Sequence, residues 1–135
     1  MTSFKSWTGT GGSSLFDLKG GVISSKQSKA LDIRNYIRCD RFYTRSDIQL
    51  KKNIEDLNDN HLDKLDKLLP KSYNFKNDNV KHFGFIAQDV EKEFPNLVST
   101  DNEGMKSVDY LEMIPLLLHK INDLERKLDE LKNNN

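Results

Sequence analysis

The sequence lacks several features that hold other small proteins together or direct them to a partner. It has a single cysteine, Cys39, so neither an internal disulfide nor a cysteine-based zinc site can form. No stretch approaches the roughly 18 consecutive apolar residues that a membrane span requires. Net charge is also absent, because 21 basic residues balance 21 acidic ones. We therefore expect no global field that attracts nucleic acid or an anionic membrane.

Apolar residues are scarce as well. Only 36% of the 135 residues are hydrophobic, whereas 31% are charged. A chain of this length fits one domain, with room for a short appended arm, but its core would be thin. Such chains often complete their core by association between copies.

The sequence does not favour a metal site or a nucleic-acid site. The three histidines, His61, His82 and His119, have no cysteine or carboxylate at ligand spacing, so we expect no metal and no cofactor. Basic side chains recur before residue 46, but acidic ones alternate with them and no stacking platform is evident. The residues concerned are Arg34, Arg38, Arg41 and Arg45, interspersed with Asp32, Asp40 and Asp47.

The first half of the chain changes pattern twice. Residues 1–21 are rich in Gly, Ser and Thr, which is typical of a loop-rich lead-in. Apolar and polar residues then alternate from Leu31, which predicts one or two half-buried strands ending near Tyr43. Beyond Ser46 the spacing predicts a long helix that Pro70 closes. Its apolar face would be Leu50, Ile54, Leu57, His61, Leu65 and Leu68.

Short elements follow this helix. Alternating aromatic residues on either side of Asn77-Asp78-Asn79 predict a hairpin over residues 73–85. Residues 88–94 read as a short helix that Pro95 stops. A second hairpin is predicted from Leu97 to Tyr110, with its turn at residues 101–104.

The last segment carries the strongest periodicity. Apolar residues step by three and four, as in the core of a coiled coil, with Pro115 early enough to be tolerated. Ile and Leu alternate in a way that by itself favours two strands, and Lys120 could pair with Glu125 between parallel chains. The alternative is an amphipathic helix packed on its own domain. The core positions are Ile114, Leu117, Ile121, Leu124, Leu128 and Leu131.

The segment from Ser46 to Lys51 allows two interpretations. Ser46 and Gln49 have the spacing of a capping box, with Asp47 in the first turn of the helix. Alternatively, the Ser46 hydroxyl is a nucleophile and the Lys51 amine its base, which requires a lowered lysine pKa. Positions five apart on a helix differ by about 140°. Ser46 must then lie outside the helix or meet a lysine of another subunit, so both interpretations can hold.

An ordered series of motifs runs from Ser46 to the end of the sequence. The motifs are Ser46-Asp47-x-x-Leu50-Lys51-x-Asn53-Ile54, a leucine-rich helix to Pro70, Tyr73, Gly84-Phe85-Ile86-Ala87-Gln88-Asp89-Val90, Phe94-Pro95-x-Leu97-Val98, Val108-Asp109-Tyr110 and the terminal leucine helix. Together they resemble the C-terminal intramolecular chaperone domain of phage endosialidases, tailspikes and tail fibres, and the resemblance covers residues 46–135 nearly end to end. A related self-cleaving domain occurs in metazoan myelin regulatory factors.

The resemblance implies an α+β fold. We expect helices and short β-hairpins, an N-terminal β arm and a C-terminal coiled-coil helix, intertwined as a homotrimer. Residues 1–45 would form the lead-in and β arm at the end of a fibre. Residues 46–135 would form the chaperone and autoprocessing domain, with the coiled coil over 111–132. The motifs at Gly84 and at Asp109-Tyr110 are interpreted as structural, as a close backbone approach and a helix entry.

The resemblance also implies a function. The domain would assist folding of the preceding fibre segment, its partner besides its own copies, and then release itself as a single-turnover serine peptidase. Ser46 would be the nucleophile and Lys51 the base, with the cut at Ser46–Asp47 or at Arg45–Ser46. We expect no small-molecule substrate, assembly in the host cytoplasm and retention of the N-terminal part in the virion. The alternative is a trimerisation or fibre-tip module that does not cleave.

Overall fold

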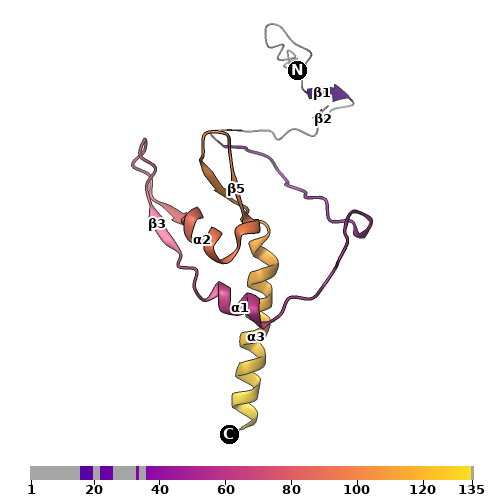
Figure 1. The fold of residues 1–135 in the computed structure, drawn as a ribbon, viewed down its shortest axis with the longest axis vertical. Coiled ribbons are helices and arrows are strands. Elements are labelled where there is room, and N and C mark those ends of the chain that lie inside the picture. The colour runs from indigo at the N-terminus through magenta and orange to yellow at the C-terminus, as the bar shows by residue number, and fades with distance from the viewer. Residues whose placement is uncertain (1–15, 20–21, 26–32, 34–35, 135) are drawn as a thin grey trace. The chain divides into compact units, whose positions relative to one another are not determined.

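The computed structural model describes residues 16–19, 22–25, 33 and 36–134, and the chain divides into two compact units, 1–47 and 48–135. In the first unit, β1 (Phe16–Lys19) pairs antiparallel with β2 (Val22–Ser25). Figure 1 shows this pair near the N-terminus. We had expected only a loop-rich lead-in here. The signal overlooked is Gly20-Gly21 in the sequence, since two glycines between short strands favour a tight hairpin turn.

The strand predicted between Leu31 and Tyr43 is wrong over the part that the structure describes. Ile33 and residues 36–43 belong to no strand. A strand needs a neighbour to take up its backbone hydrogen bonds, and no described strand of the chain pairs with this segment. Its large apolar side chains are exposed: Ile33, Tyr36, Ile37, Phe42 and Tyr43. The other positions of the predicted strand lie outside the described residues.

The long helix predicted after Ser46 is also wrong. The structure has one 3-10 turn, η1 (Ile48–Leu50), and a short helix, α1 (Asp59–Leu65), with no helix between them. Five Asn and Asp residues between positions 53 and 60 explain this, because their side chains compete with the helix for backbone hydrogen bonds. Ser46 therefore precedes a single turn.

A capping box further along the chain starts α1. The Asn58 side chain accepts a hydrogen bond from the Asn60 N–H at 3.2 Å. In return, Nδ1 of His61 accepts from the Asn58 N–H, also at 3.2 Å. These bonds satisfy backbone donors that a helix start leaves without partners, so α1 begins here.

The predicted short elements are confirmed. β3 (Lys71–Tyr73) pairs antiparallel with β4 (His82–Gly84), and α2 (Ala87–Glu93) follows. After the 3-10 turn η2 (Pro95–Leu97), β5 (Val98–Thr100) pairs antiparallel with β6 (Lys106–Val108). The chain ends in α3 (Met113–Asn133). Helices mixed with short antiparallel strand pairs agree with the predicted α+β class.

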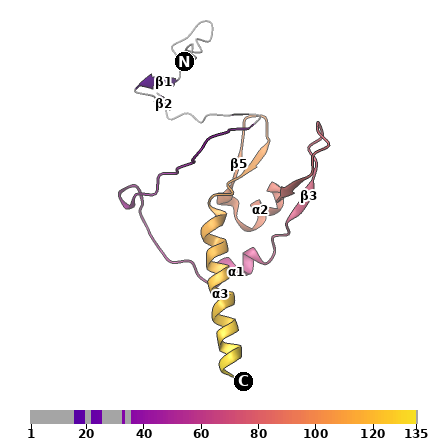
Figure 2. The ribbon, with the colours of Figure 1, turned by 180° about the vertical axis from the view of Figure 1, so that it is seen from behind.

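The core is small and lies along the first turns of α3. Its buried residues come from the segment after α1, from α2 and its C-cap, from η2 and from α3: Leu68, Val90, Phe94, Leu97, Met113 and Leu116. Figures 1 and 2 show α1 lying against the middle of α3 from both sides of the molecule, and the last turns of α3 extending past it. Only part of α3 is therefore packed against its own domain.

A close contact between β4 and Tyr110 joins the β3–β4 hairpin to the entry of α3. The Tyr110 hydroxyl accepts the Phe85 N–H at 2.9 Å, and a Cβ added at Gly84 would lie 2.5 Å from that hydroxyl oxygen. Asp109 Oδ1 accepts the N–H groups of Leu111 and Glu112 at 3.0 and 3.1 Å, which stabilises the turn that leads into α3. Both motifs are structural, as predicted.

This contact predicts that Gly84→Ala destabilises the fold by about 1–3 kcal/mol, because the methyl group must displace the Tyr110 ring. Tyr110→Phe should cost about 1 kcal/mol through the lost hydrogen bond. It also removes the clashing oxygen, so adding Gly84→Ala to Tyr110→Phe should cost less than it does in the parent chain. Urea unfolding of the four variants measures this, and additive costs would contradict the clash.

Candidate functional site

The predicted dyad residues lie on either side of the boundary between the two units. Ser46 and Asp47 end the first unit, whereas Lys51 follows η1 at the start of the second. The Lys51 N–H donates to the Ile48 carbonyl at 3.0 Å and so closes the turn. All three residues are exposed in the single chain. A contact between the Ser46 hydroxyl and the Lys51 amine stays a prediction.

The most conspicuous surface of the second unit is a row of apolar side chains along α3. We call it the α3 stripe, and its six residues are each 52–64% exposed: Ile114, Leu117, Ile121, Leu124, Leu128 and Leu131. Leu118 is also exposed and widens the row. The periodicity that predicted a coiled-coil core thus belongs to a face that the chain itself does not cover.

A different face of α3 packs on the domain. Met113 and Leu116 are buried in the core, and one turn later Lys120 Nζ lies 2.8 Å from Asp66 Oδ1. Asp123 follows at the same spacing and is only 7% exposed. The alternative, an amphipathic helix packed on its own domain, is thus correct for α3 as a helix but wrong for the face, because the heptad residues are not the ones that pack. Within the chain the charge of Lys120 is paired with Asp66, and its pairing with Glu125 between chains stays a prediction.

Asp123 is the buried charge on this packed face. Its Oδ1 lies 2.7 Å from Arg126 Nη2, and its Oδ2 lies 2.8 Å from Lys127 Nζ. The interaction with Lys127, aided by Arg126, lowers the pKa of the Asp123 carboxyl against the opposing effect of burial. The same contacts raise the pKa of Lys127 and of Arg126. The cluster therefore favours the ionised carboxylate in the folded chain.

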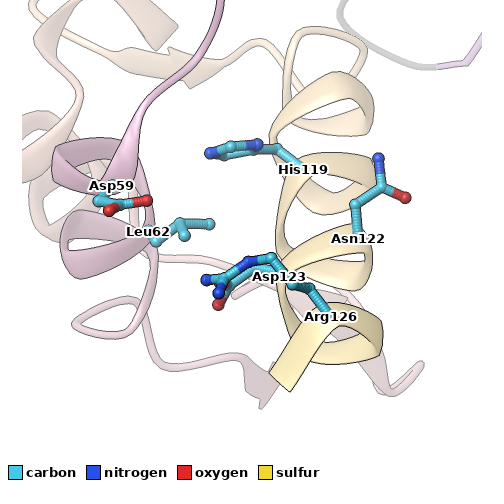
Figure 3. A pocket seen from close by; sticks show the side chains of 6 residues that line it. All are labelled: Asp59, Leu62, His119, Asn122, Asp123 and Arg126. Carbon is cyan, nitrogen blue, oxygen red and sulfur yellow. The ribbon is translucent and has the colours of Figure 1, made fainter. Parts of the chain in front are cut away.

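A hollow of about 190 Å³ lies between α1 and α3 (Figure 3). Asp59 and Leu62 line it from α1, and four residues line it from α3: His119, Asn122, Asp123 and Arg126. In the close-up, the His119 ring points towards α1 whereas Asn122 points away from it. His119 Nε2 lies 3.3 Å from the Asn58 carbonyl oxygen. The hollow thus adjoins contacts that join the two helices.

Metal-binding clusters and membrane-spanning helices are both absent from residues 16–19, 22–25, 33 and 36–134. Within those ranges, no group of three or more His, Cys, Asp or Glu side chains is placed to hold a metal ion. No helix there is both long and apolar enough to cross a membrane.

Comparison of the sequence with known proteins identifies a family for the segment that contains Ser46 and Lys51. Residues 46–99 match the Peptidase S74 family, described as chaperone of endosialidase. This segment belongs to that family. The match begins at Ser46 and ends within β5, so it contains the Ser46–Lys51 segment, the β3–β4 hairpin and α2. The family resemblance predicted from the sequence motifs is confirmed.

Two curated relatives are the long tail fiber proteins Gp37 of Enterobacteria phages M1 and Ox2. Each is 32% identical over 99 residues, which cover 67% of this chain and 39% of the relative. The chain thus spans about two fifths of the length of these relatives. The endosialidase chaperone segment is accordingly found in a chain that is homologous to phage tail fibre proteins.

Sequence reasoning missed the buried role of Asp123 and the turn at Asn53. Asp123 sits one turn from Lys120 and two from Leu116, a second three-and-four spacing beside the stripe, and that spacing was a usable signal. Asn53 has φ of 51°, and asparagine tolerates this left-handed region better than most residues.

The Asp123 cluster predicts that acid lowers the stability of the folded chain. Because the folded pKa is lowered, the stabilisation is fully present above the unfolded carboxyl value of about 3.9, and it is lost as pH falls through the folded value. Asp123→Asn should lower the urea midpoint at about pH 7 and flatten its fall towards about pH 2.

The matched control is Asp129→Asn on the same helix, whose carboxylate is exposed and lies 3.9 Å from Lys132. This variant should keep the parent profile. Equal profiles for both variants would show that the buried cluster does not contribute.

Proposed function

We propose that the chain is a trimerising intramolecular chaperone of a phage tail fibre or tailspike, which releases itself by serine–lysine autoproteolysis beside Ser46. The observation that carries the proposal is the α3 stripe, an uncovered apolar row with heptad spacing on a chain whose residues 46–99 belong to a chaperone family. The tail fibre relatives indicate the kind of structure that is assembled.

The stripe supplies a driving force for association. From Ile114 to Leu131 it runs about 26 Å along the helix at 1.5 Å per residue. Completing the burial of six half-exposed Leu and Ile side chains contributes on the order of 5–9 kcal/mol per chain. Part of this free energy offsets the entropy lost when chains associate. Each chain that joins contributes its own α3 stripe to the interface.

The segment between η1 and α1 supports the same conclusion. Three large apolar residues that were predicted to lie on a helix face, Leu50, Ile54 and Leu57, are exposed in the single chain. Ile48 in η1 is exposed as well. A monomer would expose these and the α3 stripe together, and such extensive apolar surface is typical of an interaction site. Neighbouring copies in an intertwined trimer would cover both.

A trimer formed at the C-terminus would help a fibre to fold. Intertwined β fibres depend on pairing between distant residues, which forms slowly and leaves strand edges open to aggregation. Local helices form quickly and raise the effective concentration of the three chain ends. Cleavage then removes the template, so that the fibre cannot unfold by the reverse of its assembly and becomes kinetically stable.

The proposed chemistry uses side chains alone. The neutral Lys51 amine takes the proton of the Ser46 hydroxyl, and the oxygen attacks a peptide carbonyl adjoining Ser46. The carbon–nitrogen bond breaks, the leaving amine takes the proton from the lysine, and water hydrolyses the ester. For the Ser46–Asp47 bond the attacking hydroxyl comes from Ser46 of a neighbouring copy, because Ser46 attacking its own carbonyl would have to close a strained four-membered lactone. For the alternative bond, Arg45–Ser46, the Ser46 hydroxyl of the same chain attacks the Arg45 carbonyl through a five-membered ring.

Assembly would activate the base. A lysine serves as general base only when burial or nearby positive charge lowers its pKa. In the single chain Lys51 is exposed, so the required burial would come from neighbouring copies. Cutting would then wait for a complete trimer. The competing function is a trimerisation or fibre-tip module that never cleaves.

Intact mass spectrometry of the purified protein tests the cleavage. The parent should give fragments that end or begin beside Ser46, whereas Ser46→Ala and Lys51→Ala should stay intact, with cleavage at least a thousandfold slower. Lys52→Ala, which removes the adjacent lysine, is the matched control and should still cut. An intact parent chain after long incubation would favour the non-cleaving module.

A mixing experiment separates action within and between chains. Ser46→Ala and Lys51→Ala chains are unfolded together and refolded as mixed oligomers. A cut product would place the serine and the lysine of one site on different chains. No product from a sample shown to contain mixed oligomers would count against action between subunits.

The α3 stripe predicts a sharp contrast between two neighbouring positions. Leu128→Lys puts a charge into the proposed coiled-coil core and should weaken association by at least about tenfold. Asp129→Lys makes a larger change in charge on the adjacent exposed position and should leave association unchanged. Sedimentation equilibrium measures both, and equal behaviour would show that the stripe is not the interface.

A further inference from the structure

One residue near the proposed dyad adopts an unusual backbone conformation. Among the non-glycine residues that the structure describes, Asn53 is the one with positive φ, at 51°. L-residues pay a steric penalty in this left-handed region, which asparagine and glycine bear best. Such conformations persist where the surrounding structure requires them, and they concentrate at functional sites.

The position of Asn53 relates this conformation to Lys51. The η1 turn spans Ile48–Leu50 and closes through the hydrogen bond from the Lys51 N–H to the Ile48 carbonyl at 3.0 Å. Two residues later the backbone turns left-handed, and no regular structure follows until α1 starts at Asp59. Lys51 and Lys52 therefore lie between a closed turn and a bend at a left-handed residue.

We propose that Asn53 is a positioning residue for the Lys51 base, an inference that rests on the proposed self-cleavage. The turn fixes the backbone on the N-terminal side of Lys51, and the left-handed residue fixes it on the C-terminal side. With both sides set, the long lysine side chain starts from a defined direction. Effective proton transfer requires such a defined approach, because small misplacements of a catalytic group slow reactions strongly.

The proposal assigns the effect to the backbone of Asn53 and makes a distinctive prediction. Glycine adopts positive φ without strain, so Asn53→Gly should keep the turn. Valine is β-branched and is strongly disfavoured there, so Asn53→Val should shift the backbone away from the active arrangement. If the amide side chain were the important group, both substitutions would be equally harmful.

The test follows the rate of fragment formation by mass spectrometry for the parent, Asn53→Gly, Asn53→Val and a control, Asn60→Val. Asn60 is exposed in α1, so the control introduces the same side chain at a helical position. We expect Asn53→Gly to cut within about twofold of the parent and Asn53→Val about tenfold more slowly. The control should cut at the parent rate. Sedimentation of cleavage-blocked versions carrying Ser46→Ala should give one molar mass for all four.

Each outcome decides the proposal. Equal slowing of the Gly and Val variants would overturn it in favour of a side-chain role. Parent-like cutting by Asn53→Val would overturn it as well. Slow cutting by Asn53→Val accompanied by lost association would show a general effect on folding, which also overturns it. If the parent chain itself yields no fragment, the proposed self-cleavage fails first, and the positioning role fails with it.

Discussion

The structure depends on how α3 divides its surface between two tasks. One face, which includes Met113 and Leu116, completes a small core with α2 and η2. Another face carries the α3 stripe, which stays in water in a single chain. Since 36% hydrophobic residues cannot fill a large core, the longest helix packs only one of its faces on its own domain and leaves the other uncovered. An apolar seam of this kind favours association between copies.

Polar contacts decide which face of α3 is turned inward. Lys120 reaches Asp66 after α1, and His119 approaches the Asn58 carbonyl at the capping box. Asp123, held ionised by Lys127 and Arg126, is buried on the same side. Rotating α3 to bury the stripe would separate Lys120 from Asp66 and His119 from the Asn58 carbonyl, whereas the ion pairs of Asp123 lie within α3 and would turn with it. Charges thereby specify the orientation that leaves the leucines outside.

Local patterns in the sequence predicted most of the second unit. The turn residues around Asp78 and Asp101, the stop at Pro95 and the heptad of α3 gave both hairpins, α2 and the terminal helix. Each of these elements is set by neighbours in sequence, so the pattern sufficed. Gly84 and Asp109 were also understood correctly, because a close approach and a helix entry have clear residue preferences.

The predictions failed where a segment has no cover within its own chain. The periodicity of Leu50, Ile54 and Leu57 indicated a helix, but these residues have no core to pack on, and Asn53 and Asn58 favour turns and caps. The strand predicted up to Tyr43 likewise found no described neighbour. In an assembly such segments would gain contacts with other chains, and the pattern of one sequence does not reveal those contacts. The proposed dyad of Ser46 and Lys51 belongs to the same group, because the burial proposed to activate the lysine would come from other copies.

Assembly and cutting are therefore linked in this account, and one measurement tests the link most directly. The unfolded parent chain is diluted into refolding buffer over a wide range of final concentrations, and the initial rate of fragment formation per chain is followed. The account predicts a rate per chain that rises steeply with concentration at the dilute end and levels off once oligomers are complete. A rate per chain that is the same at every concentration would contradict it, because a lone chain would then suffice.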